Sequence, residues 1–535
     1  MRKNRKFFAV VIALFMALSC LTFIGCGDSV SENEIWVRVF NGGYGTAWFN
    51  AIKTEFEKDN PGTTVTLKTT VDSTSQEALV QAKKSKDDIV MLNYNFWGDT
   101  YLGVLADLSD VYSAKPDGED GKTIAEKCNP ILLKHFKYDN KYYQMSWATA
   151  NGSMCYNKTS LDKVLGEGNW EVPITTDQMN SVAKAMKDKG HYGYVYAGDG
   201  SECYQDTYLI PALMAQYMGY ENYLNLCHGM VADEQGNYSM ATSSNIYQVL
   251  SDEGIKRPYE TLQEFTQYEH KYSYGIGFMD AQQIFYGWGY GSDDRLVAFM
   301  ANGDWLENET KSFSNNQDIK MMKMPVISAL VEKLSFYNEF EDGKAKDYYS
   351  LSAEMRKEYD DKLAEIINFV DGNIAERPAF ANEEDISIVY NARNTYHSLS
   401  FMHCAAIPIT SHNIDLAKKF LIYMCSEKAQ RIYCETLNGL SMPYGYDYSS
   451  DSQFNGRVSS FMDSANKAFD DNGYLVNQID YSSKIMYYGS FSLLKSCCVK
   501  FNRGTATANS LFNEIRSSYT TRWNNILRQS GYSIG

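Results

Sequence analysis

The chain from residue 34 onward alternates between strand-like and helix-like patterns of apolar residues. Apolar side chains take every second position at 34–40, which predicts a strand, and helical spacing at 47–60, where Asn60-Pro61-Gly62 ends the helix. The alternation continues with a strand at 64–70, a helix at 75–85 and a short buried strand at 88–92. We therefore predict a βαβαβ unit with a parallel sheet.

Two loops of this unit are rich in aromatic and amide side chains. Open parallel sheets bind ligands beyond the carboxyl ends of their strands, where the loops 41–46 and 93–99 lie. The first loop contains Tyr44, and the second contains Asn95 and Trp97. We expect at least one of Asn95 and Trp97 to bind a ligand; the alternative is that the aromatic residues of the second loop pack beneath it.

The first 25 residues have the pattern of a lipoprotein signal peptide. Four basic residues precede the uncharged run 7–25, and Phe23-Ile24-Gly25-Cys26 is typical of a lipobox. Cleavage there would leave the Cys26 thiol to carry diacylglycerol, with 26–33 as a polar tether. An uncleaved membrane helix, or a lipobox ending at Cys20, is the alternative.

The composition argues against nucleic-acid binding and against a set of structural disulfides or a cysteine zinc site. The chain has 50 Lys and Arg against 66 Asp and Glu, and without the four basic residues of the signal peptide its formal charge is −20. We therefore expect that the protein does not bind nucleic acid through its phosphates. Nine of the eleven cysteines follow Cys26, and no Cys-x-x-Cys spacing occurs among them. Buried thiols are favoured over designed disulfides or a zinc site.

No motif predicts catalysis, a metal or a cofactor. The seven histidines form no His-x-x-x-His pair, and His397, His403 and His412 cluster only loosely. Neither a P-loop nor a Gly-x-Ser-x-Gly motif is present. Carboxylates are so numerous that pairs of the glycosidase type arise by chance. We therefore predict a protein that is not an enzyme.

Several short phrases, in order along most of the chain, resemble the family-1 extracellular solute-binding proteins of bacterial ABC importers. Each phrase is weak alone, but together they are specific. They are Phe56–Gly62, Asp88–Val90 with Gly103–Leu108, Tyr143 and Trp147 with Tyr156-Asn157-Lys158, Pro173 with Thr176–Met179 and Ala183–Gly190, Gly303-Asp304-Trp305, Ala406-Ile407-Pro408 with Ala417–Leu421 and Ser426–Gln430, and Gly504-Thr505 with Phe512–Ile515.

The resemblance implies an α/β fold of the type II periplasmic-binding-protein kind, with two lobes, a hinge and a central cleft. It assigns 34–147 and 303–412 to the first lobe, and 148–302 and 413–535 to the second. One departure is large, because 82 positions separate Pro325 from Ile407. The charged, helix-like segment at about 328–391, with a predicted helix at 352–369, is either a peripheral decoration, which we favour, or a partner surface.

The resemblance also implies where a ligand would bind. The segment 141–158 would form the hinge and the cleft floor, with the ring of Trp147 facing the cleft; a core position for this ring is the alternative. Trp288 and Tyr290 could equally be a packed Gly-rich turn. The full set of expected ligand-binding residues is Tyr44, Asn95, Trp97, Trp147, Asn151, Tyr204, Asp206, Trp288, Tyr290 and Tyr488. Aromatic faces and amides suit a sugar.

The expected function is that of a lipid-anchored substrate-binding protein of an ABC importer. It would sit on the extracytoplasmic face of the membrane, bind a carbohydrate or oligosaccharide as a monomer by lobe closure, and deliver it to permease subunits. A surface glycan-binding or sensor-linked lipoprotein without a transport role, and a secreted glycan hydrolase, are the alternatives. A peptide or polyol ligand also remains open.

Overall fold

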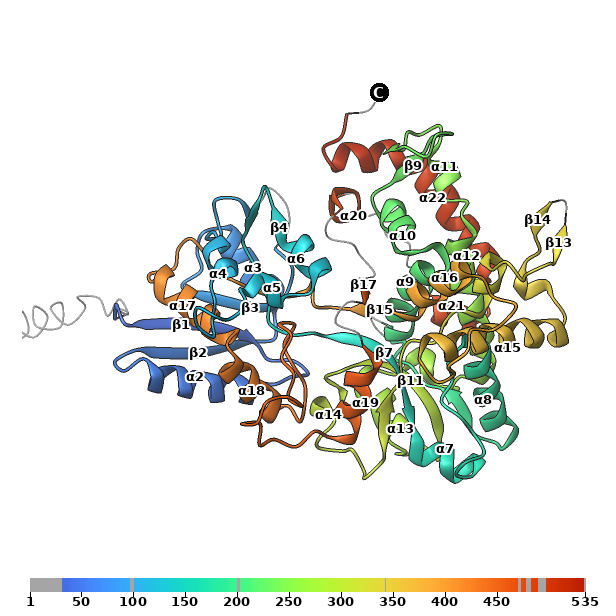
Figure 1. The fold of residues 1–535 in the computed structure, drawn as a ribbon, viewed down its shortest axis with the longest axis horizontal. Coiled ribbons are helices and arrows are strands. Elements are labelled where there is room, and N and C mark those ends of the chain that lie inside the picture. Colours follow the sequence, from blue (N-terminus) through green and yellow to red (C-terminus); the bar gives the residue numbers. More distant parts are fainter. Residues whose placement is uncertain are drawn as a thin grey trace, which may run out of the picture.

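The described part of the chain forms two lobes joined by a narrow waist. In the computed structural model it comprises residues 31–96, 101–199, 203–341, 343–469, 473–477, 483–488 and 497–533 of 535. Figure 1 shows the first lobe on the left and the larger second lobe on the right, with strand β7 (Asn151–Asn157) leading from the waist into the second lobe. The predicted signal peptide and Cys26 lie outside the described residues.

The first lobe is built on a five-stranded sheet with the order β2-β1-β3-β16-β6. Its strands are β1 (Glu34–Phe40), β2 (Thr64–Thr70), β3 (Ile89–Asn93), β6 (Met145–Ser146) and β16 (His403–Ala406). β1 runs parallel to both β2 and β3, and β16 is antiparallel to β3. The predicted parallel βαβαβ unit is confirmed, because the three strands pair in parallel and the helices α2 (Ala47–Asp59) and α3 (Ser73–Gln81) connect them.

The second lobe is built on a sheet with the order β17-β15-β7-β11-β8, and β12 adds to β7. Its further strands are β8 (Tyr192–Tyr194), β11 (Val297–Gly303), β12 (Ile319–Met321), β15 (Thr395–Ser398) and β17 (Tyr474–Val476). Every residue of β7 and β11 is buried, as expected of strands covered on both faces. The helices that contact this sheet include α8 (Thr176–Asp188) and α9 (Tyr204–Met218).

The remaining elements complete the two lobes around these sheets. The helices are α2 (Ala47–Asp59), α3 (Ser73–Gln81), α4 (Ser109–Ser113), α5 (Ile124–Lys127), α6 (Pro130–Phe136), α7 (Lys158–Leu165), α10 (Tyr220–Cys227), α11 (Ile246–Val249), α12 (Glu253–Phe265), α13 (Phe278–Phe285), α14 (Leu306–Glu309), α15 (Ala353–Val370), α16 (Glu383–Arg393), α17 (Ile414–Met424), α18 (Glu427–Thr436), α19 (Ser460–Ala468), α20 (Lys484–Tyr488), α21 (Cys497–Asn502) and α22 (Ala508–Gln529). Short hairpins pair β4 (Lys137–Tyr138) with β5 (Lys141–Tyr142), β9 (Met230–Ala232) with β10 (Tyr238–Met240), and β13 (Phe340–Glu341) with β14 (Lys344–Ala345).

The lobe boundaries differ from those that the resemblance implied. The segment 303–398, expected in the first lobe, belongs to the second, since β12 and β15 both pair with β7. The helices α17 and α18, expected in the second lobe, pack on the first: Phe420 of α17 contacts Phe56 of α2, with ring centroids 5.0 Å apart. The chain therefore returns to the first lobe at β16 and re-enters the second with α19, which contacts β12. The apolar faces of α17 and α18 complete the hydrophobic core of the first lobe.

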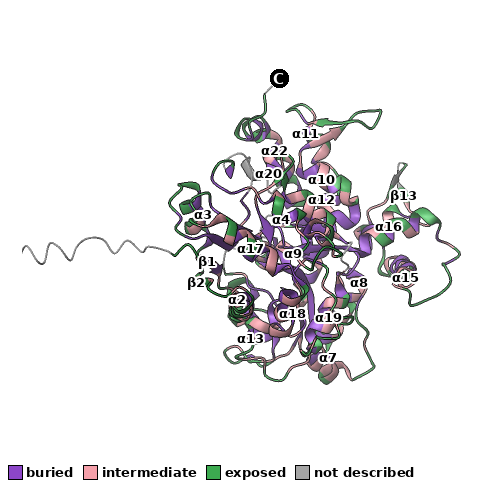
Figure 2. Cartoon of the chain, turned by 60° about the vertical axis from the view of Figure 1, so that its left-hand side comes forward, coloured by how far each residue is buried: buried purple, intermediate pink, exposed green. Residues whose placement is uncertain are grey.

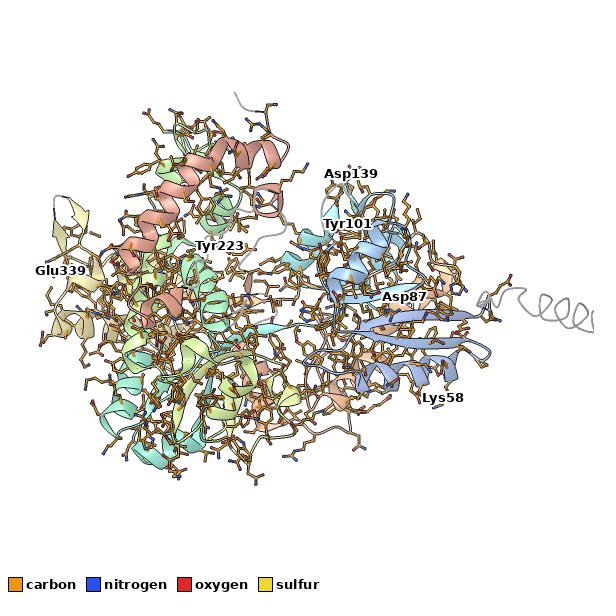
Figure 3. All side chains as sticks on the ribbon, turned by 180° about the vertical axis from the view of Figure 1, so that it is seen from behind. Lys58, Asp87, Tyr101, Asp139, Tyr223 and Glu339 are labelled. Atoms are coloured by element: carbon orange, nitrogen blue, oxygen red, sulfur yellow. The ribbon has the colours of Figure 1, made fainter. Side chains whose placement is uncertain are left out.

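The insertion at 328–391 is fixed to the second lobe. The predicted helix at 352–369 is confirmed as α15, and its N-terminus is capped by Ser352, which accepts a hydrogen bond from the Met355 N–H at 3.3 Å. A short 3₁₀ helix, Ser328–Lys333, is buried at its base. Figure 3 places Glu339 at the end of the molecule far from the first lobe. The segment is thus peripheral to the waist yet integral to the second lobe.

Buried apolar residues from both lobes form one core cluster, and Figure 2 shows the buried positions in purple. All nine cysteines beyond Cys26 are buried and outside disulfides in the described structure, which agrees with the expectation from their spacing. None of the helices in the described part of the chain combines the length and the apolar composition needed to span a bilayer.

Candidate functional site

A cavity of about 430 Å³ lies between the lobes, where strands of both sheets end. The first lobe supplies residues that follow β1, β2 and β3, and the second supplies the start of α9 and residues at the ends of β11, β15 and β17. The lining is Phe40, Gly42, Gly43, Tyr44, Thr74, Asn93, Tyr94, Tyr204, Thr207, Tyr208, Trp305, Glu309, His397, Leu399, Met402, His403 and Asn477. Its position beyond the carboxyl ends of parallel strands is where α/β sheets bind ligands.

The loop after β1 forms the first-lobe wall. Gly43 allows it to lie against the second lobe, because a Cβ at this position would come 2.6 Å from Cδ1 of Trp305. Its carbonyl also accepts a hydrogen bond from Asn308 of α14. The phenol of Tyr44 donates to Asp304 Oδ1 at 2.6 Å. The two lobes are therefore in direct contact beside the cavity.

Three stacked rings form the second-lobe wall. Tyr204 and Tyr208, one turn apart on α9, stack with centroids 4.6 Å apart and an interplanar angle of 14°. Tyr208 stacks in turn on His397 of β15 at 4.2 Å and 19°. Gly152 of β7 permits this packing, since a Cβ there would come 2.7 Å from the Tyr208 ring. The wall thus presents aromatic faces and one imidazole to the cavity.

His397 is a buried polar group without a hydrogen-bond partner. Its side chain is fully buried, and neither ring nitrogen is hydrogen-bonded in the described structure. Burial lowers its pKa to about 3, so the ring is neutral at physiological pH. A neutral imidazole offers one N–H donor and one acceptor nitrogen. Such a group is what a buried site needs to bind a hydroxyl, which also donates and accepts.

The neighbouring imidazole, His403 at the start of β16, is held by backbone. Its Nδ1 lies 3.1 Å from the Leu399 carbonyl, and burial lowers its pKa to about 4. Asn477, also in the lining, follows β17, and its carbonyl accepts a hydrogen bond from Tyr223 of α10 at 2.5 Å. Both lining residues are therefore positioned by elements that pack around the waist.

Asp304 separates this cavity from a second one. Besides Tyr44, its carboxylate accepts from Thr149 Oγ1 at 2.8 Å and from the Asn151 N–H at 3.0 Å. Burial raises the pKa of Asp304 to about 6, although these hydrogen bonds oppose the shift. The carboxylate lines a larger cavity of about 860 Å³, between α5, α19 and the 440–448 segment. That cavity is the larger of the two, but strand ends and stacked rings converge on the smaller one.

Two of the expected binding residues, Tyr44 and Tyr204, line the smaller cavity from opposite lobes. Trp147 does not, and the expectation that its ring faces the cleft is wrong. It is fully buried, stacks on Trp48 at 5.6 Å and 14°, and donates from Nε1 to the Leu92 carbonyl at 3.2 Å. The pairing of β6 with β16 turns this side chain into the first-lobe core.

The other expected residues lie elsewhere. Asn95 is buried behind the loop, where its Oδ1 accepts from Gln144 at 2.6 Å. Asn151 lines the larger cavity, and Asp206 is buried beneath α9. Trp288 and Tyr290 lie on a Gly-rich turn remote from the lining, with Trp288 Nε1 donating to the Phe313 carbonyl at 2.8 Å. Trp97 and the side chain of Tyr488 fall outside the described structure.

Several lining residues were not expected. Tyr94 is in the loop after β3 and Trp305 is in the Gly303-Asp304-Trp305 phrase, so both lay in segments already singled out. His397 and His403 were noted only as a loose cluster. Nothing local marks them, because their role depends on strands β15 and β16 joining different sheets.

A two-lobed α/β molecule with a cavity at its waist, lined from both lobes, has the architecture of a solute-binding protein. A family model described as bacterial extracellular solute-binding protein matches residues 51–455, and the chain belongs to that family.

Similar proteins are found both by sequence and by structure. The chain is 22% identical over 303 residues to the diacetylchitobiose binding protein NgcE of Streptomyces coelicolor (strain ATCC BAA-471 / A3(2) / M145), covering 56% of this chain and 58% of that protein. The GacH receptor of Streptomyces glaucescens GLA.O, solved without ligand and with acarbose, is similar with a TM-score of 0.53 at 16% identity, covering 94% of this chain and 99% of that one.

A further solved structure has a comparable likeness. RafE, solved in complex with raffinose, has a TM-score of 0.52 at 15% identity, covering 91% of this chain and 99% of that one. At these identities the likeness concerns the fold alone. It confirms the predicted type II two-lobed fold.

Proposed function

We propose that this protein captures a carbohydrate in the cavity between its lobes and delivers it to the permease of an ABC importer. The observation that carries the proposal is the pairing of aromatic faces with an unpartnered buried imidazole in one cavity between two lobes. The names of the similar proteins, which refer to diacetylchitobiose, acarbose and raffinose, support a saccharide as the ligand class.

The lining matches the two surfaces of a sugar ring. The apolar face of a pyranose can stack on Tyr204, whose half-buried ring continues into Tyr208 and His397. Its hydroxyls can bond the neutral imidazole of His397 and the amides of Asn93 and Asn477. The volume is within the range of small-molecule sites, about 300–1,000 Å³. The proposed role is binding, with no catalytic step assigned to these residues.

Lobe closure would follow from contacts made by both lobes. Tyr94 lines the cavity from the first lobe and Tyr204 from the second. A ligand closes the lobes only to the extent that it prefers the closed form, and contacts from both sides supply that preference. The closed shape would then be recognised by the permease.

The test is a panel of di- and trisaccharides followed by calorimetric titration of variants. Tyr204→Ala should weaken binding by about 1–2 kcal/mol through loss of a stacking face. His397→Phe keeps the ring but removes both nitrogens, and should weaken binding about tenfold. Trp288→Ala and His412→Phe, remote from the cavity, are matched controls that should bind normally. Wild-type affinity in both cavity variants, or turnover of the saccharide, would contradict the proposal.

The anchoring part of the proposal has its own test. We propose that Cys26 carries the lipid, so Cys26→Ser should abolish labelling by a palmitate analogue in cells and release the protein from the membrane fraction. Cys20→Ser is the control and should be labelled normally. Labelling of Cys26→Ser at the wild-type level would assign the anchor to Cys20, whereas membrane retention without labelling would assign it to an uncleaved helix.

A further inference from the structure

Three thiols and a carboxylate meet in the interior of the second lobe, beneath the cavity wall. Cys203 is the N-cap residue of α9 and Asp206 lies in its first turn, while Cys497 and Cys498 begin α21. All four residues are buried. The ligand atoms of Cys203, Asp206 and Cys498 all lie within 4.8 Å of one another. The cluster therefore joins segments 292 positions apart in sequence.

The carboxylate of Asp206 is only half satisfied by this environment. Its Oδ1 accepts from the Cys498 N–H at 3.0 Å and from the Cys497 thiol at 2.8 Å. Its Oδ2 is buried and has no hydrogen-bond partner in the described structure. A buried carboxylate oxygen without a hydrogen-bond partner is energetically costly. The arrangement therefore lacks one partner that would sit among the carboxylate and the two nearby thiols.

A second layer of side chains fixes the thiol of Cys498. Gln205 donates from Nε2 to Cys498 Sγ at 3.3 Å and to Glu269 Oε1 at 2.9 Å. Asn502 of α21 donates to the other oxygen of Glu269 at 3.0 Å. Metal sites in proteins typically hold their ligands through such outer hydrogen bonds.

We propose that Cys203, Asp206 and Cys498 bind one zinc ion that staples α9 to α21. Two sulfurs and a carboxylate oxygen are ligands that zinc accepts in tetrahedral sites, and Cys497 offers a further sulfur beside Asp206. Binding converts two thiols to thiolates and releases two protons for one dication. The net charge of the buried cluster is then unchanged, so the metal adds no uncompensated charge to the core.

The proposed site was not predictable from cysteine spacing. Cys203 and Asp206 are three positions apart, and the adjacent pair Cys497-Cys498 supplies the other side, so no Cys-x-x-Cys signature arises. Its consequence for binding is indirect. Because α9 also carries Tyr204 and Tyr208 of the cavity wall, the ion would fix the helix that presents those rings.

The experiment measures zinc in the folded protein purified without chelator. We expect about one zinc per chain by elemental analysis, release of protons on titrating zinc into chelator-stripped protein, and a melting temperature that zinc raises and chelator lowers. The variant Asp206→Asn, which keeps the shape and the Oδ1 acceptor, and the double variant Cys203→Ser/Cys498→Ser should each lose most of the zinc. Cys128→Ser, a buried thiol of the first lobe, should retain it.

Three results would overturn the proposal. One is a wild-type protein that takes up no zinc and whose melting temperature is unaffected by zinc or chelator; this result does not depend on any variant folding. Another is a disulfide between Cys203 and Cys498, detected by mass spectrometry of the unreduced protein. Zinc uptake at the wild-type level in both Asp206→Asn and the double variant would also place the ion elsewhere.

Discussion

At the scale of single residues, the local sequence does not distinguish an aromatic side chain that lines the cavity from one that packs in the hydrophobic core. Trp147 and Tyr204 both lie among small and polar residues, yet Trp147 is fully buried and Tyr204 is half-buried in the cavity lining. The difference arises from the strands around them. Trp147 follows β6, whose pairing with β16 directs its indole onto Trp48.

Trp147→Ala should therefore destabilise the fold and leave ligand binding intact. Loss of a buried, stacked indole typically costs about 3–5 kcal/mol of unfolding free energy. The folded fraction should bind a saccharide with wild-type affinity, because Trp147 is not in the cavity lining. Chemical denaturation and calorimetric titration of the same variant measure both quantities.

The exposed Trp288 provides the control for this experiment. Its ring is 47% exposed, so Trp288→Ala should change the unfolding free energy by roughly 0.5 kcal/mol or less. Unchanged stability and a tenfold weaker affinity in Trp147→Ala would show instead that this ring contacts the ligand.

At the scale of elements, periodicity predicted the N-terminal strands and helices of the first lobe and one long helix of the second. The strands at 34–40 and 64–70 coincide with β1 and β2, and the helix at 352–369 with α15 to within one residue. These segments have one buried face with a regular period, so local pattern and tertiary burial agree. The role of the insertion was less predictable, because charged residues that would be solvated on an isolated helix are here buried in ion pairs.

The clearest of these ion pairs joins α12 to the insertion. Arg257 of α12 lies 3.1 Å from Glu332 and 2.7 Å from Asp347, and the exposed fractions of the Arg257 and Glu332 side chains are only 4% and 3%. Burial raises the pKa of Glu332, and the guanidinium opposes that shift. Removing the cation would leave the buried Glu332 carboxylate without its cation, whereas Asp347, whose side chain is 29% exposed, would keep its pair with Lys256 at 2.8 Å.

Arg257→Ala should lower the unfolding free energy by about 3–5 kcal/mol, the cost of breaking a buried ion pair from one side. Adding Glu332→Gln should recover part of this loss, because the remaining buried charge is removed. Denaturant titration of the two single variants and the double variant gives the coupling free energy between Arg257 and Glu332. Lys357→Ala, which removes an exposed pair with Asp361, should cost about 0.5 kcal/mol or less. A comparable effect of both substitutions would show that the insertion is not held by this pair.

At the scale of the whole molecule, the short sequence phrases shared with the family predicted two discontinuous lobes, but not which segments belong to each lobe. Periodicity identifies a strand without saying which sheet it joins, and β15 and β16 are only five positions apart yet lie in different lobes. The lining of the cavity could not be predicted for the same reason. Its polar groups His397 and His403 come from these two strands, so their proximity exists only once both sheets have formed.

The contact between Tyr44 and Asp304 provides a test of how the lobes are coupled. Tyr44→Phe removes a charge-assisted hydrogen bond from the first lobe to the return crossing, worth about 1.5–3 kcal/mol. If closure is a two-state equilibrium, the variant should populate more open molecules, and its affinity should fall about tenfold in proportion to the lost closed fraction. Small-angle scattering should show a larger radius of gyration without ligand and a wild-type value at saturation.

Tyr112→Phe is the matched control for the coupling, because the Tyr112 hydroxyl donates to the Gln144 carbonyl at 3.0 Å within the first lobe. It removes a buried hydrogen bond of similar length without touching the waist, so it should lower stability but leave the radius of gyration and the affinity unchanged. Equal radii for Tyr44→Phe and Tyr112→Phe without ligand would mean that the Tyr44–Asp304 bond does not hold the lobes together. The closed form would then have to be stabilised by the ligand alone, through the rings of Tyr94 and Tyr204 on either side of the cavity.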